Sequence, residues 1–170
     1  MGSSSQIAVL ILAALASGDS PDRFVIPESS PLELSSQGPG HGDEATFSGT
    51  LSLTGTLEAK WLYVDDTPER LDVWITPTPE DLEKLPYTVE DKPQQLSVSN
   101  EEEVVIMLFG EQLGEELLNA KITEAKGSAK FTFTDYSTQI ECDRRYYWVR
   151  VLSVEKEERG DIVLIPRVGC

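Results

Sequence analysis

The sequence predicts an all-β fold. Apolar and polar residues alternate along residues 47–63, shorter alternating segments follow at intervals, and turns rich in Pro, Gly or charged residues separate them. A period of two is typical of a half-buried strand, because a helix would repeat its apolar positions about every 3.6 residues. The composition, 39% hydrophobic and 26% charged, is that of an ordinary globular domain.

The longest alternating segment predicts a strand with two bends. Its apolar positions are Phe47, Leu51, Leu53, Leu57, Ala59, Trp61 and Tyr63. Gly49 and Gly55 fall on the same parity, where glycine indicates a bend or bulge of the kind that lets one strand serve two sides of a small barrel. The alternative is two strands joined near Thr54 and Gly55.

A second strand and a short helix follow. Residues 71–75 alternate again, and Pro77 ends this strand because proline cannot donate a ladder hydrogen bond. Thr78 fits a helix N-cap, with Pro79 in the first turn and acidic residues behind it. Pro86 stops the helix after one or two turns.

Five further segments are predicted as strands. Residues 104–109 are apolar on both parities, which indicates a central strand covered on both faces. The others are residues 118–122, 131–133, 146–154 and 162–165, each alternating or rich in β-branched and aromatic residues. The prediction is a domain of seven or eight strands with one short helix.

A long first strand bent at glycines, with a helix between later strands, favours an OB-like small barrel over a two-sheet β-sandwich of short, even strands. Residues 115–155 contain the run LLNAKITEAKGSAKFTFTDYSTQIECDRRYYWVRVLSVE. This run resembles the closing half of small exported bacterial OB-type domains of unknown function. The resemblance implies a strand, a ligand-facing loop and a long final strand, and it carries over no site residue.

The chain is predicted to have three parts. Residues 7–16 are ten apolar residues, too few for a membrane span, and Ala14-Leu15-Ala16 fits a signal-peptide cleavage site before Ser17. No Lys or Arg precedes them, so the alternative for residues 1–16 is a core helix of a cytoplasmic protein. Residues 17–45, rich in Ser, Pro and Gly, are predicted as a linker or tail, and residues 46–170 as the β domain. The alternative for residues 24–26 is a short edge strand that holds this segment to the domain.

The net charge of −16 excludes nucleic acid as the expected partner, because binding a phosphate backbone requires Lys and Arg. In an exported protein, Cys142 and Cys170 are expected to form a disulfide, the alternative being two free thiols. His41 lies in a Gly- and Pro-rich stretch and cannot supply a catalytic base or, with two cysteines, a zinc site. The sequence therefore predicts no catalytic residue, no metal and no cofactor.

The candidate binding surface lies on the predicted strand over residues 146–154 and on the residues just before it. With Tyr147 and Val149 facing the core, the opposite parity carries Arg144, Tyr146, Trp148 and Arg150. Trp74 is a second candidate, because it lies between two core positions. Aromatic and guanidinium groups on an exposed barrel face can stack sugar rings or a peptide.

The functional expectation is an exported, periplasmic or secreted, non-catalytic binding or interaction module for a protein, peptide or carbohydrate, without stable membrane insertion. The alternatives are a secreted hydrolase that uses two carboxylates, and a structural or inhibitory subunit that pairs through a strand edge.

Overall fold

The computed structural model describes residues 24–38, 44–141, 144–156 and 162–166, and it has the predicted all-β class. The strands are β1 (Phe24–Val25), β2 (Glu33–Gln37), β3 (Ala45–Ser48), β4 (Leu51–Val64), β5 (Thr67–Pro77), β6 (Tyr87–Thr88), β7 (Leu96–Val98), β8 (Ile122–Glu141), β9 (Arg144–Lys156) and β10 (Val163–Pro166). The helices are α1 (Pro79–Leu82), α2 (Glu101–Phe109) and α3 (Glu111–Leu118).

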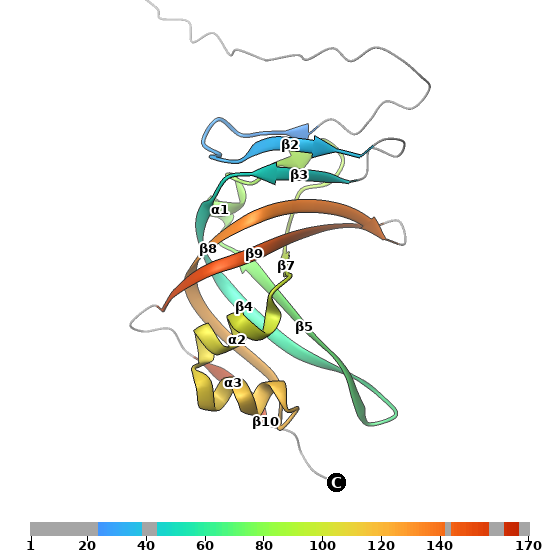
Figure 1. Cartoon of the computed structure of the whole chain (residues 1–170), viewed down its shortest axis with the longest axis vertical. Helices are drawn as coiled ribbons and strands as arrows, with labels where there is room; N and C mark the ends of the chain where they lie inside the picture. Colours follow the sequence, from blue (N-terminus) through green and yellow to red (C-terminus); the bar gives the residue numbers. More distant parts are fainter. Residues whose placement is uncertain (1–23, 39–43, 142–143, 157–161, 167–170) are drawn as a thin grey trace, which may run out of the picture.

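Five strands close into a barrel (Figure 1). β4 pairs antiparallel with β5 and β5 with β7, then β7 runs parallel to β9, β9 pairs antiparallel with β8, and β8 returns to β4. A five-stranded Greek-key barrel with a helical connection between its third and fourth strands is the OB arrangement. The closed pairing favours the predicted barrel over the two-sheet sandwich.

The barrel interior is filled by the apolar parity of each strand. Leu57, Ile75, Phe131, Phe133 and Val149 are completely buried. Because successive strand residues point to opposite faces, the polar neighbours of these residues form the outer wall. The predicted alternation of residues 47–63 and 71–75 is thus confirmed, and so is α1 with its cap, since the Thr78 hydroxyl accepts from the Asp81 amide at 3.4 Å.

The two glycines of the first segment have different roles. Gly49 separates β3 from β4 with φ of +115°, a conformation that favours glycine. Gly55 lies inside the continuous β4, where a Cβ atom would stand 2.6 Å from the Thr76 carbonyl oxygen of β5. The single strand predicted over residues 47–63 is thus two strands divided at Gly49. The alternative break near Thr54 and Gly55 was also wrong, and Gly55 instead permits close approach of two strands.

The described part of the expected linker belongs to the β domain. β2 pairs with β3, which pairs with the C-terminal half of β8 (Figure 1). Leu32 is only 1% exposed, and the Phe24 ring packs edge-on against Phe47 at 5.4 Å. Residues 24–38 are thus held by apolar contacts and strand pairing, and the domain begins before the predicted boundary at residue 46.

The largest correction concerns residues 104–109, which form α2 and not a strand. Three glutamates occupy the first turn, where the helix dipole favours negative charge, and Val104, Val105, Leu108 and Phe109 are buried on one side. The prediction was a strand covered on both faces because residues 104–109 are all apolar, which hides the helical spacing of the buried positions. Asn100 fixes α2 to β9, since its side-chain amide bonds the Val151 carbonyl at 2.8 Å and the Val151 amide at 2.9 Å.

Of two further predicted strands, the one over residues 118–122 was wrong, and the one over residues 131–133 was confirmed as part of a longer strand. Leu118 ends α3, and Ala120 has a positive φ of 55° that interrupts any alternation before Ile122. The segment at residues 131–133 is part of β8, a single 20-residue strand. β8 can be this long because β4, β9, β3 and β10 pair along its different stretches.

Several predictions lie outside the described residues: the signal-like residues 1–16, His41, and the cysteines Cys142 and Cys170. Among the residues that the structure describes, no helix is long and apolar enough to cross a membrane.

Candidate ligand-binding groove

The outer wall of the barrel places two tryptophans in one row across three strands. Trp74 on β5 pairs with Ser97 on β7, and Ser97 pairs with Trp148 on β9. Both tryptophans point outward because their neighbours in sequence fill the core. Adjacent strands lie about 4.8 Å apart, so the two tryptophan backbones are about 10 Å apart with only a serine side chain between them. The row therefore has two indole groups on either side of the much smaller Ser97 side chain.

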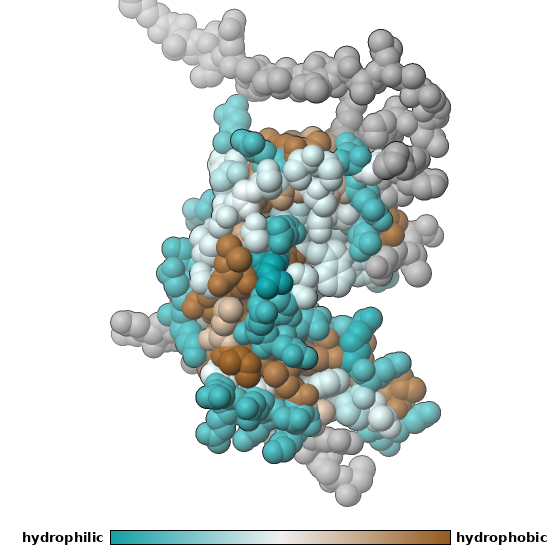
Figure 2. Space-filling view, in the orientation of Figure 1, coloured by the Kyte–Doolittle hydropathy of each residue, from teal (hydrophilic) through white to brown (hydrophobic). Residues whose placement is uncertain are grey.

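A groove with a volume of about 940 Å³ lies over this row. Its lining includes Trp74, Ser97, Arg144, Tyr146 and Trp148 from the strands, together with residues of the connection between β6 and β7. The volume is within the range of pockets that bind small molecules or short segments. On the face drawn in Figure 2, apolar residues gather in a band that is bordered by hydrophilic residues.

Two buried tyrosines anchor the chain on either side of β6, one just before it and one in the β6–β7 connection that forms a wall of the groove. The Tyr136 hydroxyl donates to the Pro86 carbonyl at 2.6 Å, and the Tyr147 hydroxyl donates to the Asp91 carbonyl at 2.8 Å. The two rings stack with centroids 6.0 Å apart. Burial raises the pKa of both phenols well above the usual value, so both remain protonated donors at neutral pH. The groove wall is thus fixed to the barrel core.

Trp148 has an unused hydrogen-bond donor. Its Nε1 atom is buried and has no hydrogen-bond partner within the described structure, whereas the Nε1 of Trp61 donates to the Leu117 carbonyl at 2.6 Å. Leaving a buried donor unpaired costs about 1–3 kcal/mol. Trp148 lines the groove, so this cost falls on a residue of the candidate site.

The groove carries both signs of charge on a strongly acidic chain. Four cationic residues line it, and so do four carboxylates. The cations are Arg70, Lys92, Arg144 and Arg145, and the carboxylates are Asp72, Glu90, Asp91 and Glu101. The chain as a whole has a net charge of −16, so the groove is far less negative than the rest of the protein.

Glu101 is the carboxyl group whose protonation the groove perturbs. Burial raises its pKa above the ordinary value, and the negative charge of Asp72 adds to the effect, while Arg70 opposes it. Arg70 itself is bound to Asp72, with 2.6 Å between its Nε and a carboxylate oxygen. Perturbed carboxyl groups in clefts are frequent at functional sites.

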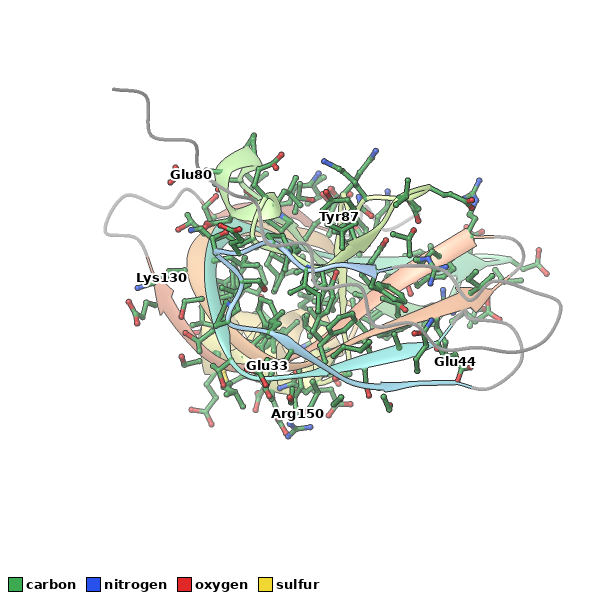
Figure 3. The ribbon with its side chains drawn as sticks, turned by 90° about the horizontal axis from the view of Figure 1, so that it is seen from above. Glu33, Glu44, Glu80, Tyr87, Lys130 and Arg150 are labelled. Atoms are coloured by element: carbon green, nitrogen blue, oxygen red, sulfur yellow. The ribbon has the colours of Figure 1, made fainter. Side chains whose placement is uncertain are left out.

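The structure brings four of the five predicted site residues to the groove: Trp74, Arg144, Tyr146 and Trp148. Arg150 is not among the lining residues. It points outward on the side away from Tyr87 (Figure 3), and its guanidinium lies 3.5 Å from Glu103 of α2. Strand parity alone could not separate Arg150 from the others, because the distinction depends on where α2 packs.

Sequence reasoning missed Asp72, Ser97, Glu101 and the β6–β7 connection. Ser97 alternates with the buried Leu96 and Val98, which was a usable signal for an outward position. Nothing in the sequence indicated that Glu101 would lie beside Asp72, because that depends on α2 being a helix.

Comparisons with protein-family models, curated proteins and solved structures found no match. Within the described ranges, no group of three or more His, Cys, Asp or Glu side chains could hold a metal ion.

Proposed function

We propose that this chain is a non-catalytic binding module, exported from the cytoplasm, that holds its ligand in the groove over Trp74 and Trp148. The observation that carries the proposal is the row of two outward tryptophans over a groove that has a fixed wall and an unpaired buried donor. Trp74 and Trp148 are half-buried, and the parts of their indoles that remain accessible offer apolar area with little conformational entropy to lose on binding.

The arrangement favours recognition by stacking with a few polar contacts. Trp74 and Trp148 supply apolar faces, and the surrounding Arg, Gln and carboxylate groups supply donors and acceptors. The Tyr147 and Tyr136 hydroxyls keep the wall in place without a ligand. A preformed site of this kind loses little entropy when it is occupied.

The test uses two sets of probes, cellotetraose and chitotetraose on one side and capped heptapeptides on the other, with binding followed by calorimetry. We expect at least one probe class to bind, and Trp148→Ala and Trp74→Ala to weaken that binding at least tenfold. Leu152→Ala is the matched control, because Leu152 is 49% exposed on β9 and does not line the groove. Absence of binding by every probe, or binding that both tryptophan variants leave unchanged, would overturn the proposal.

Export is proposed from the apolar residues 7–16 and the Ala14-Leu15-Ala16 sequence. N-terminal sequencing of the protein recovered from the periplasm or medium of an expressing bacterium should read from Ser17. Protein that remains in the cytoplasm with Met1 or Gly2 at its start would contradict export and leave the groove proposal unaffected.

A hydrolase is the second candidate, favoured by one observation. Glu101, with its raised pKa, and Asp72, bound to Arg70, both line the groove and interact electrostatically. Glycoside hydrolysis uses two carboxyl groups in different environments, one of them with a raised pKa. Cleavage of the tetrasaccharide probes that Glu101→Gln abolishes would favour this candidate over a simple binding module.

A further inference from the structure

The groove has a direction, which follows from the strand register. β5 runs antiparallel to β7, and β7 runs parallel to β9, so the residue order on β5 is opposite to that on β9. Asp72, two residues before Trp74, therefore lies on one side of the tryptophan row. Arg144, four residues before Trp148, lies on the other side. At about 3.3 Å per residue, these positions are about 7 Å and 13 Å from the row.

One end of the groove, next to the N-terminus of α2, has an excess of negative charge. Asp72 and Glu101 line it, and one guanidinium, that of Arg70, lies there bound to Asp72. Glu101 has no ion-pair partner within the described residues. By the strand register, Arg150 on β9 lies across the sheet from Asp72 on β5, but its guanidinium is paired with Glu103 outside the groove.

The other end, next to the β8–β9 hairpin, has an excess of positive charge. Arg144, Arg145 and Lys92 line it with two carboxylates, Glu90 and Asp91. Arg145 packs over the Phe24 ring at 5.5 Å and Lys92 over the Tyr87 ring at 4.6 Å, which holds both cations at this end. Arg144 is exposed at the start of β9.

We infer that the groove binds an extended peptide segment whose basic side chain lies against Glu101 and Asp72, whose aromatic side chain stacks on Trp74 and Trp148, and whose acidic side chain lies against Arg144. The inference rests on the proposed function and names the ligand class of the same groove. Charge complementarity favours this class, because a neutral sugar can hydrogen-bond charged groups of either sign and does not need opposite signs at the two ends. These distances place the basic residue of the peptide two positions before its aromatic residue. They place the acidic residue four positions after the aromatic residue.

The closing experiment measures binding of the peptide KSFSSSE, acetylated and amidated, to the full chain by calorimetry at low salt. The matched peptides are QSFSSSE, KSFSSSQ and QSFSSSQ, which remove one or both charges. We expect the first peptide to bind most tightly, each lost charge to weaken binding about two- to fivefold, and added salt to reduce the differences.

Variants of the protein assign each charge to its end. Glu101→Gln should weaken KSFSSSE about two- to fivefold and leave QSFSSSE unchanged, whereas Arg144→Gln should weaken KSFSSSE equally and leave KSFSSSQ unchanged. Glu80→Gln and Lys130→Gln are the charge-matched controls. Both residues are exposed and neither lines this groove (Figure 3).

The outcomes separate the inference from the proposed function. If all four peptides bind equally and Trp148→Ala abolishes binding, the charge assignment is overturned and the binding function stands. If the tetrasaccharides bind through Trp148 and no peptide binds, the peptide class is overturned and the binding function again stands. If no probe of either class binds, both are overturned.

Discussion

Truncation of Trp148 tests whether this residue belongs to a site or to the core. Trp148 lies on the outer face of β9 between the buried Tyr147 and Val149, and it lines the groove. Removing the indole in Trp148→Ala enlarges an open groove and leaves no enclosed cavity. It also removes a buried Nε1 donor that has no partner within the described structure, which recovers part of the contact energy lost.

The magnitude follows from these opposing effects. Loss of a half-buried aromatic group costs about 1–2 kcal/mol, and release of an unpaired donor offsets about 1 kcal/mol of that cost. We therefore expect Trp148→Ala to lower the free energy of unfolding by no more than about 1 kcal/mol. By contrast, Phe133→Ala, which empties a completely buried site, should cost about 3–5 kcal/mol.

The assay is urea unfolding followed by circular dichroism, because the substitution removes one of the three tryptophans that would give the fluorescence signal. The comparison covers wild type, Trp148→Ala, Trp148→Phe and Phe133→Ala. Equal m-values among them would show that a shifted midpoint reports a change in the free energy of unfolding. Trp148→Phe keeps an aromatic face without the donor, so its unfolding free energy should equal or exceed that of wild type. A loss of 3 kcal/mol or more in Trp148→Ala, about that of Phe133→Ala, would refute the placement of Trp148 in a site.

The remaining predictions concern the groove wall, the barrel, Glu101 and the cysteines. Tyr136→Phe removes the hydrogen bond to the Pro86 carbonyl and should lower the free energy of unfolding by about 1–3 kcal/mol in a urea melt. Tyr146→Phe is the control at an exposed residue, and it should leave the free energy of unfolding nearly unchanged. Gly55→Ala places a Cβ atom 2.6 Å from the Thr76 carbonyl oxygen and should lower the free energy of unfolding by about 1–3 kcal/mol. Ser52→Ala is the control at an exposed residue of the same strand, and an unchanged urea melt of Gly55→Ala would mean that β4 and β5 are not closely apposed there. The folded state raises the pKa of Glu101 above its ordinary value of 4.5, so its contribution favours folding below pH 4.5 and is lost as the pH rises through the folded pKa. Glu101→Gln should therefore raise the free energy of unfolding at neutral pH and flatten its pH dependence in that window, and the same pH profile in both proteins would contradict this. Cys142 and Cys170 lie outside the described residues, so their disulfide stays a prediction from the sequence. Thiol titration of the denatured, unreduced protein from an oxidising compartment should find no free thiol, and two free thiols would contradict the bridge.

The sequence by itself determined the strand class, because period-two alternation over residues 47–63 and 71–75 directly reflects which side of a sheet is buried. It also determined α1, whose cap and prolines act locally. The outward direction of Trp74 and Trp148 followed from the same parity, so half of the site was readable without a structure.

Only the tertiary structure decided the rest. A continuous apolar run such as residues 104–109 is consistent with a buried strand or a mostly buried helix, and packing of α2 against the barrel selected the helix. That choice placed Glu101 in the groove and Arg150 beside Glu103. Trp74 and Trp148 become neighbours only because β7 pairs with both β5 and β9, and such pairings between distant segments depend on barrel closure, which no local pattern encodes.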